Sequence, residues 1–160
     1  MPLNFLRKKK SDAPKAANEM RRVTRKGGVV ATTMWDGSRA NEFNGCFWDA
    51  AITIDPTVKR TSERRRLYNT AEALSDLLNG AGLADIEVTD LTMACQFSAF
   101  DDLWQRYLTG EGPQAVYMAG LSADHREALR RAMRQNVLGD GPDGPFTLQA
   151  KAWAVRGMVP

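Results

Sequence analysis

Residues 23–36 read VTRKGGVVATTMWD, and this stretch decides how the first part of the chain folds. The basic residues before Gly27-Gly28 are typical of the last turn of a helix, where positive charge complements the helix dipole. Residues 29–34 form a β-branched and apolar run, which predicts a strand. A run with so few polar residues is typical of a strand covered on both faces, as in a parallel sheet.

The order of these elements argues against a phosphate-binding loop at the two glycines. A phosphate loop follows a strand and opens a helix, so that the helix N-terminus faces the anion. Here a helix predicted over residues 13–25 comes first and the strand comes second. Gly27-Gly28 is therefore predicted to be a helix-to-strand turn. The GDGPDG stretch at 139–144 opens no helix and does not fit a dinucleotide fingerprint either.

Hydrophobic periodicity extends the pattern along the chain and predicts an α/β fold. Further helices are predicted over residues 43–54, 70–81, 98–108, 115–121 and 122–137, and further strands over 86–97 and 146–155. Thr70, Ser98 and Ser122 are expected to be N-caps, with Asp101 completing a near capping box with Ser98. The apolar positions of residues 86–97 change register near Thr89, which suggests a bulge or bend.

Length and composition are those of an ordinary globular chain. Its 160 residues predict one domain over residues 13–160, preceded by a basic flexible arm at residues 1–12. No apolar run is long enough to span a membrane, and no apolar stretch of a secretory signal follows the basic start. Two cysteines, Cys46 and Cys95, are too few for a disulfide framework or a metal cluster. These features favour a cytoplasmic protein with buried thiols.

The positive charge is concentrated at the N-terminus. Residues 1–26 hold nine Lys/Arg against two Asp/Glu, and the remaining residues hold thirteen against seventeen. Such a basic run can contact nucleic acid or an anionic surface. It lacks the interleaved aromatic residues that single-strand binding uses, so a solvated arm is the favoured interpretation.

Few residues are candidates for chemistry. The single histidine, His125, falls in a predicted first helical turn, is expected at the surface and cannot build a histidine metal site, so no metal site is predicted. Trp35 and Asp36 end the first predicted strand, where open α/β sheets gather their ligands, although a structural role is also open. The aromatic residues Phe47 and Trp48, like those of the 98–108 helix, fit a core better than a pocket.

Six stretches, in order along the chain, resemble class I S-adenosylmethionine-dependent methyltransferases, and most closely the small-molecule branch similar to enzymes of ubiquinone and menaquinone biosynthesis. They are LNF (3–5), NEMRRVTRKGGVVATTMWD (18–36), FWDAA (47–51), NGAGLADIEV (79–88), FSAFDDLWQRYLTGEGP (97–113) and LQAKAWAVRG (148–157). The ordered pair of a helix–RxGG–strand and a later GAGL–strand is its most specific part.

The resemblance implies a partial Rossmann-like methyltransferase sheet. The matching strands are the fifth, sixth and seventh of the family, with a remnant of the fourth, helices on both faces and a helical insert between the last two strands. It implies S-adenosylmethionine as cofactor and a small-molecule acceptor. Asn4 and Phe5 match cofactor-side positions of the family's active cleft, and Trp35 and Asp36 match acceptor-side positions. Phe47 and Trp48 would line the acceptor pocket.

The resemblance begins at the fourth strand of the family, after its Gly-rich cofactor loop and its two cofactor-binding acids. In the family's sheet the fifth strand is interior, flanked by the fourth and seventh strands. Residues 29–34 would therefore leave an apolar edge, which predicts a homodimer or a complementing chain. The expectation is a methyltransferase-related protein that is not catalytic alone. The alternative is a non-catalytic dimerisation or interaction module.

Overall fold

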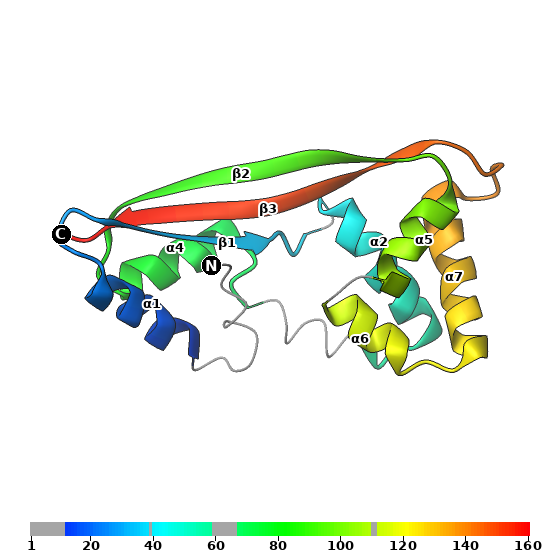
Figure 1. Cartoon of the computed structure of the whole chain (residues 1–160), viewed down its shortest axis with the longest axis horizontal. Coiled ribbons are helices and arrows are strands. Elements are labelled where there is room, and N and C mark those ends of the chain that lie inside the picture. Colours follow the sequence, from blue (N-terminus) through cyan, green and yellow to red (C-terminus); the bar gives the residue numbers. More distant parts are fainter. Residues whose placement is uncertain (1–11, 39, 59–66, 110–111) are drawn as a thin grey trace. The chain divides into compact units, whose positions relative to one another are not determined.

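The structure is a computed structural model that describes residues 12–38, 40–58, 67–109 and 112–160 (Figure 1). The described residues of Met1–Asn41, Glu63–Thr92 and Lys151–Pro160 form one compact unit, unit 1. Those of Glu42–Ser62 and Met93–Ala150 form the other, unit 2. The single domain over residues 13–160 stays a prediction, and the basic arm lies outside the described residues up to residue 11.

Unit 1 is built on a three-stranded sheet with the order β1-β3-β2. The strands are β1 (Val29–Trp35), β2 (Ala84–Phe97) and β3 (Phe146–Met158), and the ends of β2 and β3 belong to unit 2. β3 pairs antiparallel with β1, from Val29 opposite Met158 to Trp35 opposite Ala152. Figure 1 shows β1 and β2 running in one direction and β3 between them in the other. The mixed α/β class is confirmed, and the last strand lies beside the first, as the resemblance implied.

The helices of unit 1 pack on one face of this sheet. Helix α4 (Ala71–Gly80) supplies Leu74 and Leu78 to a core that includes Val30, and α1 (Asp12–Val23) packs beside α4. Along β1, buried and exposed residues alternate. The predictions of a strand covered on both faces, and of helices on both faces of the sheet, are wrong for this part of the described chain. An antiparallel sheet can leave one face to water, and an apolar run does not show which arrangement it joins.

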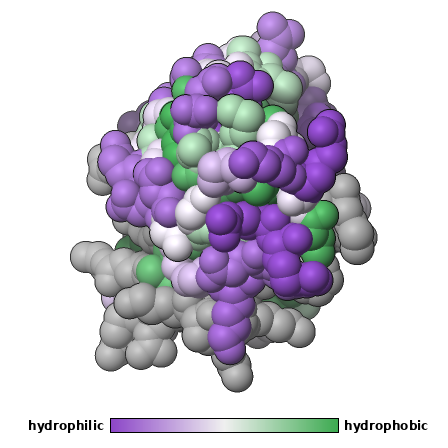
Figure 2. All heavy atoms as spheres, turned by 90° about the vertical axis from the view of Figure 1, so that its left-hand side faces the viewer, coloured by the Kyte–Doolittle hydropathy of each residue, from purple (hydrophilic) through white to green (hydrophobic). Residues whose placement is uncertain are grey.

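Two glycine turns shape the ends of the unit 1 helices. Gly27 has a φ of 71° and donates its N–H to the carbonyl of Val159 at 2.8 Å, which confirms the predicted helix-to-strand turn. Gly82 has a φ of 76°, and Leu83 donates to the carbonyl of Leu78 at 3.2 Å, so α4 ends in a Schellman-type cap. The α1 end of the unit is largely hydrophilic, with smaller apolar areas between the polar groups (Figure 2).

Unit 2 is an aromatic-rich helical core. Its helices are α2 (Glu42–Ile54), α5 (Phe100–Thr109), α6 (Pro113–Ala119) and α7 (Ala123–Leu138). The last three lie between β2 and β3 in the chain, so the predicted helical insert is confirmed. The core includes the side chains of Phe47, Phe97, Phe100, Leu103, Trp104, Tyr107, Met118, Leu129 and Met133.

β2 is a single strand through Thr89 and Asp90. Ile86 packs in the core of unit 1, whereas Phe97 is buried in that of unit 2. The change of hydrophobic register therefore accompanies the passage of the strand from one unit to the other.

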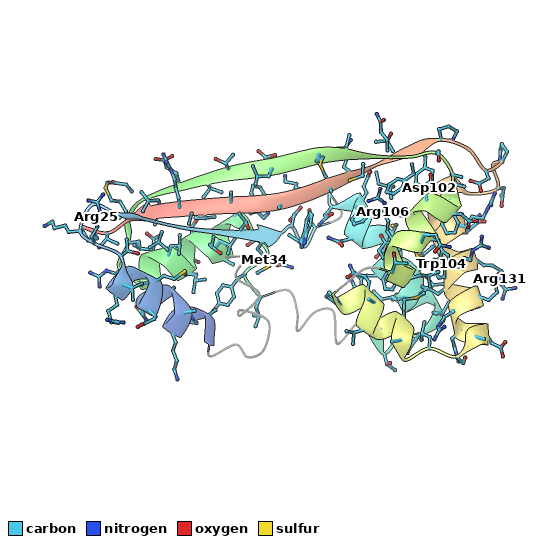
Figure 3. The ribbon with its side chains drawn as sticks, viewed as in Figure 1. Arg25, Met34, Asp102, Trp104, Arg106 and Arg131 are labelled. Carbon is cyan, nitrogen blue, oxygen red and sulfur yellow. The ribbon has the colours of Figure 1, made fainter. Side chains whose placement is uncertain are left out.

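Two predicted N-caps lie in unit 2, and one of them needs a correction. Ser122 accepts the N–H of His125, as predicted, and this exposed histidine turns its Nδ1 to the same hydroxyl at 2.8 Å. The predicted cap at Ser98 with Asp101 is wrong, because α5 begins at Phe100, one residue later than a cap at Ser98 requires. The N–H and the hydroxyl of Ser98 instead donate to the carboxylate of Asp102 (Figure 3). Asp101 instead pairs with Arg130 of α7 at 2.6 Å.

Among the described helices, none combines the length and the apolar character that crossing a membrane requires.

Candidate functional site

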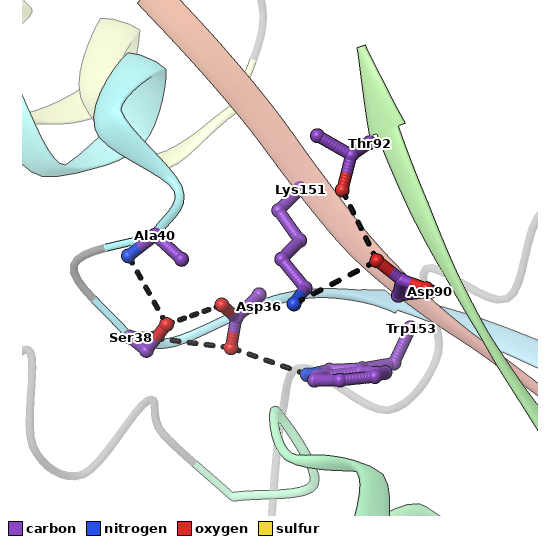
Figure 4. A network of polar contacts seen from close by, with 7 residues as sticks. All are labelled: Asp36, Ser38, Ala40, Asp90, Thr92, Lys151 and Trp153. Carbon is purple, nitrogen blue, oxygen red and sulfur yellow. Dashed lines mark hydrogen bonds and ion pairs between the residues drawn. The ribbon is translucent and has the colours of Figure 1, made fainter.

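The chain turns sharply at the carboxyl end of β1, and Asp36 organises that turn (Figure 4). Its backbone N–H donates to the carbonyl of Lys151 at 2.9 Å and extends the β1–β3 ladder by one residue. Its carboxylate accepts the N–H of Ser38 at 3.2 Å, the Ser38 hydroxyl, and the indole N–H of Trp153 at 3.2 Å. The bond to the N–H two residues on is an Asx turn, so the residue type follows from local geometry.

Asn41 closes the turn from the other side. Its Nδ2 donates to the carbonyl of Asp36 at 3.2 Å, and the side chain is only 1% exposed. This bond fixes the amide orientation, because the opposite orientation would place two oxygens against each other. Its Oδ1 is buried and has no hydrogen-bond partner among the described residues.

Lys151 lies next to this network on β3. Its Nζ is 4.3 Å from the centroid of the Trp153 ring and 3.8 Å from a carboxylate oxygen of Asp90. Asp90 in turn accepts a long bond of 3.4 Å from the Thr92 hydroxyl. The ammonium group is thus held by a ring face and a distant carboxylate, which is a cation–π arrangement supported by a weak ion pair.

The two predicted residues at the end of β1 point in different directions. Asp36 is 7% exposed and bonds Trp153, whereas Trp35 is 53% exposed on the face that the helices leave open. Adjacent residues of a strand alternate between faces, so a ligand on one face of the sheet does not contact both side chains. The predicted cofactor-side residues, Asn4 and Phe5, lie outside the described residues.

The predicted acceptor-pocket residues of unit 2 lie in and against its core. Phe47 is fully buried and meets Trp48 edge-on with ring centroids 5.0 Å apart. Tyr117 packs against both rings at 6.0 and 5.9 Å. Because Phe47 has no exposed surface, a ligand would reach it only if the groups that cover it moved. The acceptor role of Phe47 and Trp48 stays a prediction.

A polar cluster in unit 2 was not predicted from the sequence. The Tyr107 hydroxyl donates to the carbonyl of Phe43 at 2.5 Å. The Cys46 sulfur lies 3.7 Å from the hydroxyl oxygen of Tyr107. Burial raises the pKa of the Cys46 thiol from its ordinary value of 9.0 to about 11. Burial, with the nearby Cys46 as the next cause, also raises the pKa of Tyr107. A thiol with a raised pKa stays protonated at neutral pH and is a poor nucleophile.

The described residues do not fit S-adenosylmethionine at the end of β1. Gly37 is the glycine that follows this strand, but a Cβ there would overlap with the Asn69 side chain, which already fills the space. Gly37 also donates its N–H to the Asn69 carbonyl at 3.1 Å. The carboxylate of Asp36 is engaged by three donors rather than open to a ribose. Within the described ranges no group of three His, Cys, Asp or Glu side chains could hold a metal ion.

No protein-family model matches the chain, and no curated protein matches it at a significant level. Among solved structures, the chain is similar to a protein from Bacillus halodurans C-125 that carries a provisional assignment as a methyltransferase, at 15% identity and a TM-score of 0.44. The match covers 92% of this chain and 58% of that one, so this chain spans less than two thirds of the other protein's length. A likeness of this degree assigns no activity.

Proposed function

We propose that this chain is a methyltransferase-related protein with a small-molecule acceptor, which is not catalytic alone. It would supply the side of a class I methyltransferase sheet that holds the fifth, seventh and sixth strands. The order β1-β3-β2, with the reversed last strand between two strands of the other direction, is the observation that supports this proposal. The helical insert between β2 and β3 agrees with it.

The free edge of β1 is where the remainder of such a sheet would join. β1 has β3 on one side and no strand of the described residues on the other. An edge strand of seven residues presents unpaired N–H and C=O groups that favour pairing with another strand. The partner would be a second copy of this chain or a separate chain that completes the sheet.

S-adenosylmethionine would then be held mainly by the completing strands. The residues described at the end of β1 do not fit the cofactor, so no step of methyl transfer is derived from them. Their contribution is positional, because Asp36 and Asn41 fix the end of β1, the strand at which the acceptor would be presented.

The test is calorimetric titration with S-adenosylmethionine and with its demethylated product. The titrations are run on the purified chain and on the complex recovered with a tagged chain from its native cells. Binding by the complex and not by the chain alone supports the proposal. Binding by the chain alone overturns the division of the site between chains. Binding by neither overturns the methyltransferase assignment and favours the second candidate.

The second candidate is a non-catalytic dimerisation or interaction module. It is favoured by one specific observation, the exposure of apolar side chains on the sheet of unit 1, where Val29 is 57% and Trp35 53% exposed. The titrations described above separate the two candidates, because an interaction module binds neither form of the cofactor.

A further inference from the structure

The chain passes from α1 into β1 through a segment rich in cations, here called the basic end. It consists of Arg21 and Arg22 in the last turn of α1 and of Arg25 and Lys26 in the turn that follows, and all four are exposed. Figure 2 looks onto this end of unit 1, where hydrophilic residues predominate, and Figure 3 labels Arg25 at the same end. The basic end is therefore a solvent-facing surface of unit 1.

Most of this positive charge has no partner among the described residues. Arg22 forms a two-pronged contact with Glu19 at 2.7 and 2.8 Å. Arg21, Arg25 and Lys26 form no ion pair within the described ranges. A helix C-terminus carries a partial charge of about −0.5, which favours cations there. That partial charge is small beside the three positive charges that remain when Glu19 is set against the four cations.

The acids of the neighbouring helix lie away from the basic end. The Arg21 guanidinium is placed over Gly82, just beyond α4, with its Cζ 3.4 Å from the position that a Cβ on this glycine would take. The basic end thus lies beside the C-terminal end of α4. Glu72 is in the first turn of that helix, and Asp76 is one turn further along. Neither forms an ion pair with a described residue of α1.

The acids of β2 and the last residue of the chain reduce the charge without cancelling it. Two exposed acids of β2 lie against cations of β3, Glu87 against Arg156 and Asp90 against Lys151. Asp85 is exposed at the start of β2, and the carboxylate of Pro160 follows Val159, which accepts the N–H of Gly27. The four cations exceed Glu19, Asp85 and this carboxylate taken together, so the basic end keeps a net positive charge. An anionic partner therefore finds a complementary surface here.

An exposed aliphatic side chain within the basic end indicates the kind of anionic partner. Val23 lies between Arg22 and Arg25 in the sequence and is 65% exposed. An apolar side chain gains free energy when it leaves water for the region among lipid headgroups, whereas a phosphodiester backbone offers it no such place. Residues 12–33 contain no aromatic residue on which a nucleic-acid base could stack. Cations around an exposed aliphatic residue suit a lipid surface.

We propose that the basic end binds the surface of an anionic lipid bilayer, with Val23 inserted among the headgroups. Each Lys or Arg close to such a bilayer strengthens binding about fivefold. The three cations without an ion pair, Arg21, Arg25 and Lys26, therefore favour an anionic over a neutral bilayer by about a hundredfold. Attachment of this kind is reversible, and it does not depend on the methyltransferase assignment.

Co-sedimentation of the full chain with lipid vesicles tests the proposal. Vesicles of phosphatidylcholine with about a third of phosphatidylserine should bind the chain about a hundredfold more tightly than vesicles of phosphatidylcholine alone. Added salt should weaken this binding, because the Debye length falls from about 10 Å at 0.1 M to about 3 Å at 1 M. A chain that does not bind the phosphatidylserine vesicles at low salt overturns the proposal.

Two matched charge reversals locate the surface. Arg25→Glu changes the basic end, and Arg131→Glu makes the same change of net charge at an exposed arginine of α7 that also forms no ion pair with a described residue (Figure 3). Arg25→Glu is expected to weaken vesicle binding about 30-fold, since it alters the charge by two units. Arg131→Glu should leave binding unchanged. Equal effects of the two reversals, or full binding by Arg25→Glu, overturn the assignment to the basic end.

Val23→Ala distinguishes a bilayer from a nucleic acid, because it removes apolar surface and keeps the charge. It should weaken vesicle binding about three- to tenfold. A chain that binds a short DNA duplex more tightly than the vesicles, with no effect of Val23→Ala on either, overturns the lipid assignment and favours nucleic acid. Circular dichroism of each variant shows whether it is folded. None of these residues lies at the carboxyl end of β1, so this proposal and the proposed function fail separately.

Discussion

Replacement of Gly37 by alanine tests how the turn after β1 is held. The backbone there needs no special conformation, because Gly37 is not among the glycines with positive φ. What requires glycine is the side chain of Asn69, with which the added Cβ would overlap. The overlap with Asn69 therefore predicts a loss of stability by overpacking.

The magnitude follows from the kind of clash. Overpacking by a methyl group costs about 1–3 kcal/mol where the neighbour shifts only in part. For a chain of 160 residues, each kcal/mol lowers the melting temperature by about 2–4 °C. We expect a reduction of about 3–9 °C for Gly37→Ala, because Asn69 also accepts the Gly37 N–H through its carbonyl and is not free to leave.

The assay is a double-mutant cycle measured by urea unfolding. Asn69→Ala removes the atoms that overlap with the new methyl group, so the double variant Gly37→Ala/Asn69→Ala is expected to recover stability. The coupling should be about 1–2 kcal/mol, a value typical of residues in direct contact. If the two substitutions are additive, the space beside Gly37 is not filled by Asn69. The argument that this space excludes a cofactor would then fail.

Three further predictions concern buried groups and a cap. The raised pKa of Cys46 makes the unfolding free energy fall as the pH rises from about 9 to about 11, by about 2 kcal/mol, because the unfolded thiol ionises first. Urea unfolding across this range should show the fall, and Cys46→Ala should remove it between about pH 9 and 10, above which the raised pKa of Tyr107 contributes a fall of its own. Asp143 accepts the N–H of Phe100 at the start of α5 at 2.9 Å, so Asp143→Ala should cost about 1 kcal/mol in thermal unfolding, whereas Asp143→Asn should cost little. Trp153→Phe deletes the indole donor to the buried Asp36 carboxylate and should lower the free energy of unfolding in urea by about 1–3 kcal/mol. An unchanged free energy of unfolding would contradict this hydrogen bond.

Local signals in the sequence predicted the local structure well. Thr70 and Ser122 cap their helices as expected, since a cap depends on residues within one turn. The glycine turns at Gly27 and Gly82 also follow from short-range rules, because they need a left-handed backbone. The capping partner of Ser98 was misassigned between two adjacent acids, Asp101 and Asp102, because a choice of one residue depends on side-chain geometry.

Features that depend on distant residues were not predictable in the same way. An apolar run such as residues 29–34 indicates a strand, but its pairing with β3 and its exposed face are set by residues more than a hundred positions away. The contact between Cys46 and Tyr107 joins positions 61 residues apart, and nothing in either local pattern points to the other. Asp143 caps α5 from 43 residues downstream of Phe100, where the sequence showed only a Gly/Pro/Asp loop.

Asp36 was a candidate for orienting an acceptor, and the structure limits what it could contribute. An ionised carboxylate has about four lone-pair positions, and three donors already occupy this one: the Ser38 N–H, the Ser38 hydroxyl and the Trp153 indole. A carboxylate so engaged is held in place and has little capacity left for a ligand. The neighbouring Asn41 differs, because its buried Oδ1 has no described donor. That oxygen is as inaccessible as the ring of Phe47, because Asn41 is only 1% exposed. At this end of β1, the described carboxylate and amide groups therefore hold the turn in place rather than present an open acceptor to a ligand.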